Sequence, residues 1–212
     1  MYIPAHFEET RVDVLHDLVR NHPLATLVTL DQEGLNANHI PMELDLEPPP
    51  LGTLRGHVSR ANPVWRNFSS AVGALLIFQG PEIYITPSWY QTKQESGKVV
   101  PTWNYAVVHA YGPLRIVEDP KWLKALVERL TNRNEAPRPE PWEVADAPDD
   151  YIEGQLRGIV GIEVPIARLL GKWKVSQNRP EADRKGVARG LHDLGKANAS
   201  CMAELVDRPQ SE

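Results

Sequence analysis

The chain has 212 residues, of which 42% are hydrophobic and 24% charged, and its formal net charge at pH 7 is −5. This length and composition exclude a disordered chain and fit one large globular domain or two small ones. The negative charge argues against a protein that mainly coats DNA. The apolar runs are too short to span a membrane and no secretory signal is visible, so a cytoplasmic protein without membrane contact is expected.

The N-terminal part of the sequence predicts a helix followed by paired strands. Residues 10–21 place their apolar side chains on one helical face, with Thr10 as the cap, and Pro23 ends the run. Residues 24–30 read as a strand, and residues 35–46 alternate apolar and polar positions after the turn sequence DQEG. This combination is typical of a β-hairpin.

The middle of the sequence adds further strands. Residues 53–58 read as a strand, and residues 73–79 as a buried strand that turns at Gly80 and Pro81 to pair with residues 82–86. Residues 87–100 read as a polar loop.

The C-terminal half mixes helices with strands. Residues 102–117 form a long predicted strand, bent at Gly112, and Asp119 followed by Pro120 marks the start of a helix. The later predicted elements are a short helix opening at 150, a strand over 159–166, a strand over 171–177 and a helix over 179–191.

The order of these elements favours a mainly β (α+β) fold. About eight strands and four or five helices without regular alternation fit an antiparallel barrel better than a Rossmann sheet. We expect one domain over residues 1–212, with residues 134–150 as a surface excursion and residues from about 196 to 212 as a C-terminal tail.

The stretch GHVSRANPVW, residues 56–65, predicts an anion site. A strand delivers Ser59 and Arg60, and Asn62 with Pro63 reads as a helix cap and first helical residue. A hydroxyl, a guanidinium and the free N–H groups of a helix start suit a phosphate. The competing interpretation is a plain cap beside a solvated arginine.

The stretch GKWKVSQNRP, residues 171–180, has a polar row of the same kind. In a strand, Lys172, Lys174, Ser176 and Asn178 share one face, and Trp173, Val175 and Gln177 share the other. The polar face is either a solvated surface or a second contribution to an anion site.

The stretch PTWNYAVVHAYG, residues 101–112, carries an aromatic row. Trp103, Tyr105 and Tyr111 share a face with Val107 and His109, and Asn104 points the other way. Such a row suits a flat heteroaromatic ring, although an aromatic strand face more often belongs to a core or a dimer interface. With the two anion sites, the three stretches fit a planar ring with a phosphate tail.

The histidines do not predict a metal centre. Their spacing matches no zinc motif, so no metal site is expected. His39 and His57 lie on predicted strands and are the only candidates for an iron or haem ligand, but buried structural histidines are more common.

Seven segments in order, MYIP, HVSRANPVW, FQGP, YITPSWY, PTWNY, IVGIEV and GKWKVSQNRPEADRKGV, resemble the PaiB family of FMN-binding negative transcriptional regulators. The resemblance implies a split β-barrel like that of pyridoxamine phosphate oxidases. It also implies a homodimer with flavin sites at the subunit interface.

The resemblance further implies where FMN is held. The phosphate would lie near Ser59, Arg60 and Asn62, with help from Lys172 or Lys174. The ring would lie along residues 36–41 and be covered by Trp103 to Tyr105 of the partner subunit. The full set of implied cofactor-binding residues is Asn38, His39, Ile40, His57, Val58, Ser59, Arg60, Asn62, Trp103, Asn104, Tyr105, Lys172, Lys174, Gln177 and Asn178.

The function expected from this resemblance is a flavin-linked negative transcriptional regulator. The alternatives are a flavin-dependent oxidoreductase acting on a small molecule and, less favoured, a haem-binding split barrel. No residue can be named as catalytic. Residues 168–189 hold a surplus of basic side chains that could contact DNA, but no helix-turn-helix is recognisable.

Overall fold

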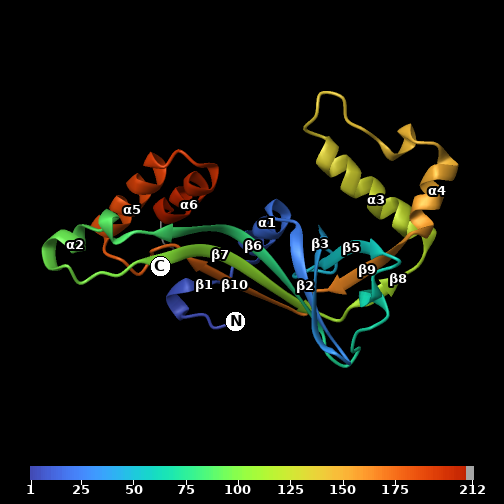
Figure 1. The fold of residues 1–212 in the computed structure, drawn as a ribbon, viewed down its shortest axis with the longest axis horizontal. Coiled ribbons are helices and arrows are strands. Elements are labelled where there is room, and N and C mark those ends of the chain that lie inside the picture. Colours follow the sequence, from blue (N-terminus) through green and yellow to red (C-terminus); the bar gives the residue numbers. More distant parts are fainter. Residues whose placement is uncertain (209–212) are drawn as a thin grey trace. The chain divides into compact units, whose positions relative to one another are not determined.

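A computed structural model describes residues 1–208 and divides the chain into two compact units. Unit 1 comprises residues 1–18, 79–108 and the described chain from 170 to 208, and unit 2 comprises residues 19–78 and 109–169. Figure 1 shows the path of the chain through both units. The three stretches predicted to bind the ligand are therefore distributed over both units. Residues 56–65 belong to unit 2, residues 171–180 belong to unit 1, and residues 101–112 run from unit 1 into unit 2.

Unit 2 is built on antiparallel strands. The hairpin of β2 (Leu24–Asp31) and β3 (Gly34–Pro41) pairs Leu24 with Pro41 and Asp31 with Gly34, as the turn sequence predicts. Residues 75–77 of β6 (Ala74–Ile85) pair with the other edge of β2. A separate four-stranded sheet has the order β4 (Glu43–Asp45), β5 (Thr53–Ser59), β9 (Ile159–Pro165) and β8 (Arg115–Val117).

Two helices cover one side of this four-stranded sheet (Figure 1). They are α3 (Pro120–Glu135) and α4 (Asp149–Arg157). α3 begins where the sequence predicts, because the Asp119 side chain accepts a hydrogen bond of 2.9 Å from the Lys121 backbone N–H. Arg129 of α3 forms an ion pair of 2.8 Å with Glu43 of β4, which fixes the helix to the sheet edge.

Unit 1 contains the strand order β1 (Glu8–Glu9), β10 (Arg168–Lys174), β7 (Thr102–Gly112) and β6. β6 and β7 pass from one unit into the other along the chain. The remaining elements of the described chain include the helices α1 (Val12–Asn21), α2 (Gln91–Ser96), α5 (Glu181–Asp193) and α6 (Ala197–Asp207), and the short 3₁₀ helices η1 (Ala5–Phe7), η2 (Pro63–Trp65), η3 (Pro87–Trp89) and η4 (Val144–Asp146).

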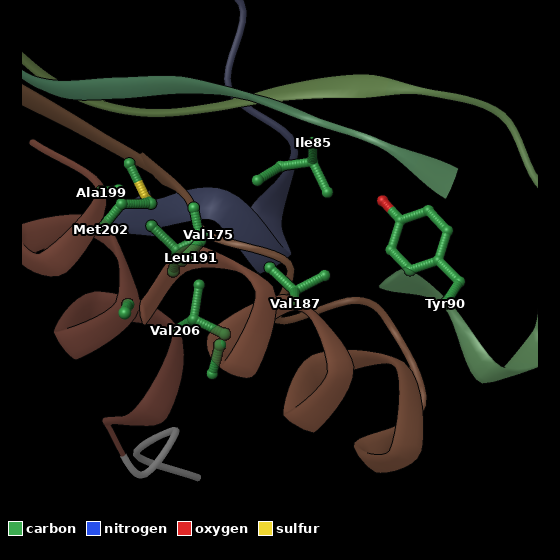
Figure 2. Close-up of a cluster of buried hydrophobic side chains, with 10 residues drawn as sticks. Ile85, Tyr90, Val175, Val187, Leu191, Ala199, Met202 and Val206 are labelled. Carbon is green, nitrogen blue, oxygen red and sulfur yellow. The ribbon is translucent and has the colours of Figure 1, made fainter. Parts of the chain in front are cut away.

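The apolar cluster of unit 1 joins α5 and α6 to the end of β6 (Figure 2). Val187 and Leu191 are one helical turn apart on α5 and both are fully buried. On α6, four buried residues follow the helical repeat of three and four. They are Ala199, Met202, Ala203 and Val206.

The C-terminal segment that we expected to be a tail therefore forms a packed helix as far as Asp207. Its apolar repeat gives it a face to bury, which a tail would lack. Residues 209–212 lie outside the described part of the chain.

Two local expectations in the middle of the sequence are wrong. β6 runs without a turn through Gly80 and Pro81, because Gly80 is buried where a Cβ would lie 3.0 Å from the Ala106 carbonyl oxygen. Its glycine allows close packing there rather than a reversal. The predicted loop at 87–100 contains η3 and α2, and Gly97 ends α2 with a φ of 67°.

The strand that carries the lysines begins and ends three residues earlier than predicted. β10 ends at Lys174, and Ser176 has a φ of 66°, in the left-handed region. The period of two stops there, so the predicted single row from Lys172 to Asn178 does not exist as such. The α+β fold class is confirmed: antiparallel sheets carry helices at their faces, and strands and helices each make up about a third of the described chain.

Candidate functional site

A cavity of about 610 Å³ opens in unit 2 between β3, β5 and α4. This volume lies in the usual range for small-molecule sites, roughly 300–1,000 Å³. Seven of the predicted site residues line it, namely Asn38, His39, Ile40, His57, Val58, Ser59 and Asn62. Pro41, the last residue of the segment 36–41 predicted for the ring, lines it as well. Sequence reasoning missed the other four lining residues, which are Gly154, Gln155, Gly158 and Ile159.

The pairing of β5 with β9 brings the missed residues to the cavity. Ser59 pairs with Ile159, so the residues just before β9 lie beside the end of β5. The Arg60 backbone N–H donates a 2.8 Å hydrogen bond to the Gly158 carbonyl and extends this contact by one residue. The C-terminal end of α4 thereby becomes a wall of the cavity.

A chain of side-chain amides runs along one side of the cavity. Asn62 Nδ2 donates to Asn38 Oδ1 at 2.7 Å, and Asn38 Nδ2 donates to Asn36 Oδ1 at 2.7 Å. Asn62 Oδ1 also accepts from the Val64 N–H at 3.0 Å, which confirms the predicted cap. The amides are therefore held in fixed orientations before any ligand arrives.

The helix that Asn62 caps is only the three-residue η2. Such a short element aligns too few peptide units to provide the helix dipole that the sequence led us to expect. The polar groups at this end of the cavity are therefore side chains and single N–H groups. Ser59 is among them, and its hydroxyl already accepts from the Ala61 N–H at 3.3 Å.

His57 lies on β5 and is partly buried, and its Nδ1 atom has no hydrogen-bond partner within residues 1–208. Burial lowers the pKa of His57 below its ordinary value of 6.5, so the imidazole is neutral at pH 7. His39, by contrast, is exposed on β3. A neutral imidazole offers a ligand one donor and one acceptor.

Arg60 is engaged within the protein and does not line the cavity. Its Nη1 donates to Glu118 Oε1 at 2.7 Å, and its Nε donates to the Arg157 carbonyl at 2.9 Å. Its guanidinium also lies 5.5 Å from the centre of the Trp65 ring. Arg60 thus ties the end of β5 to the end of α4, and any contact with a phosphate would have to compete with Glu118.

In unit 1, cations gather near the end of β10. Lys172 Nζ donates to the Tyr2 carbonyl at 3.2 Å and lies 5.3 Å from the centre of the Tyr105 ring. Lys174 Nζ donates to the Thr102 hydroxyl. Burial, and to a smaller extent the charges of Lys172 and Arg179, lowers the pKa of Lys174. Within the described residues, none of these three cations pairs with a carboxylate, so this surface retains a positive charge.

The remaining predicted residues of unit 1 have contrasting environments. Asn104 is buried, and its Nδ2 donates to Ser176 Oγ at 2.9 Å. Gln177 is occupied by its own turn, because its Oε1 accepts from the Val175 N–H at 2.8 Å. Asn178 is exposed. Trp103 is 52% exposed and contacts the ring of Tyr84 edge to face at 6.1 Å.

The predicted residues thus form two groups, each within one unit. The group on β3, β5 and η2 shares one cavity. In unit 1, Tyr105 lies over the buried Lys172, while Trp103 is exposed and Lys174 is half-buried. The roles predicted for individual residues stay predictions.

Comparison with known proteins identifies the family of the chain. Residues 1–168 match the family described as "Putative FMN-binding domain". The chain is 33% identical to the Bacillus subtilis protein named "Protease synthase and sporulation protein PAI 2", over 98% of this chain and 97% of that protein. It is 36% identical to an uncharacterised protein of Emericella nidulans, over 97% of this chain and 96% of the relative.

Solved structures with low sequence identity share the fold. The FAD and heme binding protein of Mycobacterium smegmatis superposes with a TM-score of 0.58 at 16% identity, covering 86% of this chain and 80% of that one. A conserved hypothetical protein of Mycobacterium tuberculosis gives 0.57 at 13% identity, covering 85% and 95%. In the described part of this chain, no helix has the length and apolar character needed to cross a membrane.

Proposed function

The chain belongs to the PaiB family of FMN-binding proteins, and from this premise we propose that it holds FMN in the cavity between β3, β5 and α4 and acts as a flavin-linked negative transcriptional regulator. The observation that carries the proposal is that seven predicted residues, from two separate segments of the chain, line one cavity.

The residues of the cavity suit the chemistry of FMN. Ile40, Val58 and Ile159 supply apolar surface for the ring, and the amides of Asn38 and Asn62 supply oriented donors. Ser59 and Asn62 are the candidates nearest the end of β5 for the phosphate. FMN would supply redox chemistry or a redox-sensitive signal, and this chain would supply binding and orientation.

The test is the absorption spectrum of the purified protein, with and without added FMN. We expect an oxidised-flavin spectrum and a stoichiometric uptake that weakens in Ser59→Ala. A colourless protein that takes up no FMN would contradict the proposal.

We further propose that the protein works as a homodimer. Tyr84 and Trp103 expose 47% and 52% of their surface in unit 1, and Tyr105 extends the row. Exposed aromatic patches commonly mark interaction surfaces. Trp103→Glu should convert a dimer into a monomer in sedimentation and weaken FMN retention, whereas Tyr151→Ala on exposed α4 should do neither.

Repression by direct contact with DNA is a finer proposal about the basic residues 168–189. Lys185 is paired with Glu181 at 2.6 Å, and Arg184 is partly buried and donates to the Val206 carbonyl. Lys172 is buried, so the candidate phosphate contacts in unit 1 are the half-buried Lys174 and Arg179 and the exposed Arg189. DNA binding in a gel shift should weaken steeply with salt and further in Lys174→Ala.

A flavin-dependent oxidoreductase is the second candidate function. It is favoured by a second cavity of about 390 Å³ that shares Pro41 and His57 with the first, since an oxidoreductase needs room for a substrate beside the flavin. Rapid reduction of bound FMN by NADH or NADPH, followed by reoxidation by a small-molecule acceptor, would favour the enzyme over the regulator.

A further inference from the structure

The second cavity lies between α3 and β5 in unit 2. One face of α3 forms a wall of the cavity, because the lining residues of the helix are spaced by three or four residues. They are Val127, Leu130, Thr131 and Asn134. Pro41 and His57 form the opposite wall. Glu135 and Trp142 complete the lining.

The apolar face of α3 is incompletely covered by the described chain. Leu123 and Leu126, nearer the start of the helix, are buried, whereas Val127 and Leu130 are only partly buried. The ion pair between Arg129 and Glu43 and the hydrogen bond from Arg133 to the Arg20 carbonyl hold α3 at the sheet edge. Both contacts come from the same face of α3, four residues apart, and hold the helix in place beside the gap.

The polar groups of the cavity are compatible with a neutral ligand. Both oxygens of Glu135 are engaged, one by Arg138 Nε at 3.1 Å and the other by the Trp142 N–H at 3.3 Å. These contacts also anchor the segment that carries Trp142, whose side chain is 45% exposed at the rim. The cavity thus presents no unpaired carboxylate, and an aromatic ring stands at its opening.

From these contacts we infer that the cavity between α3 and β5 is a second ligand site, which takes a small, neutral, flat ring compound bearing one hydrogen-bonding group. The ring packs against Val127, Leu130 and Trp142, and its polar group faces Thr131, Asn134 or His57. His57 borders both cavities, so a ligand in the second cavity and FMN in the first would lie against the same imidazole. The effect of one ligand on the other rests on the proposed function, whereas binding to the second cavity does not.

The probe is 2-naphthol, a flat neutral compound with one hydroxyl group, titrated into the full-length protein by calorimetry. We expect saturable binding with one site per chain. Thr131→Trp, which fills the cavity, and Trp142→Ala, which removes the ring at its rim, should each weaken binding by about tenfold or more. The matched controls are Asn132→Trp at an exposed position of the same helix and Tyr151→Ala, an exposed aromatic residue on α4, and neither should change the affinity.

The experiment separates failure of this inference from failure of the proposed function. In FMN-loaded protein, 2-naphthol should shift the flavin absorption bands, and this shift should disappear in Thr131→Trp. A protein that binds 2-naphthol but no FMN would sink the flavin assignment and leave the second site standing. Three results would each overturn the inference. They are no saturable binding to the folded protein, affinities of both cavity variants equal to that of the parent protein, and binding that vanishes as the protein concentration rises. The last result is expected if a second copy of the chain covers the cavity.

Discussion

Asn62 offers a direct way to separate structural support from ligand binding. Its Oδ1 accepts from the Val64 N–H at 3.0 Å and its Nδ2 donates to Asn38 Oδ1 at 2.7 Å. Asn62→Ala removes both contacts, at about 1 kcal/mol for the cap and about 1 kcal/mol for the amide hydrogen bond, so a loss of about 2 kcal/mol in unfolding free energy is expected. Asn62→Asp keeps the cap acceptor and should cost about 1 kcal/mol.

The order of the two variants reverses for FMN binding if Asn62 lies near the phosphate. A carboxylate about 4 Å from a phosphate is repelled by about 1 kcal/mol in water and about 4 kcal/mol near a protein surface, so Asn62→Asp should weaken FMN binding by at least about fivefold. Asn62→Ala loses a donor but adds no charge, and should weaken FMN binding less.

The two quantities are measured on the same samples. Urea unfolding followed by tryptophan fluorescence gives stability, and quenching of FMN fluorescence gives affinity. Asn132→Asp, which adds the same charge at an exposed position on α3, is the control and should change neither. If Asn62→Asp binds FMN as tightly as the parent protein, the phosphate does not lie beside Asn62 and the reasoning is refuted.

Three further predictions concern packing, pH and a buried carboxylate. Gly190→Ala should lower the unfolding free energy by about 1–3 kcal/mol, because the new Cβ would lie 2.4 Å from the Trp89 ring. Gly154→Ala is the control and should not lower it, because its Cβ would meet only the end of Arg157 at 3.8 Å. Equal melting temperatures of the two variants would contradict this prediction. Burial places the folded-state pKa of His57 below 6.5, so on acidification the unfolded state binds this proton before the folded state does. The unfolding free energy should therefore fall as the pH drops from about 6.5 towards the lower folded-state pKa. Denaturant titrations should show a shallower fall in His57→Gln. Asp183 is 1% exposed and accepts hydrogen bonds from the Thr92 N–H at 2.9 Å and the Thr92 hydroxyl at 3.0 Å. Asp183→Ala should therefore release the α2 segment and accelerate limited proteolysis at residues 91–97. An unchanged cleavage rate would show that other contacts hold α2.

The sequence by itself determined the features that depend on neighbours along the chain. The Asp119 and Asn62 caps are side chains that bond N–H groups two residues away, and both occur as predicted. The hairpin of β2 and β3 follows from its turn and its alternation, and the family resemblance supplied the FMN cofactor. Each of these signals is local or is carried by a contiguous motif.

Only the tertiary structure decided what depends on contacts between distant segments. Gly80 with Pro81 reads as a turn, yet the close approach of β7 makes it the interior of β6. Gly154, Gln155 and Gly158 carry no chemical signature, and they line the cavity because β5 pairs with β9 about a hundred residues later in the chain. Arg60 contacts Glu118 and the end of α4, two contacts that no motif predicted, and its predicted phosphate contact stays a prediction. Strand register and long-range ion pairs bring together side chains that are far apart in the sequence. No periodic pattern links such residues, so their contacts could not be predicted from local sequence.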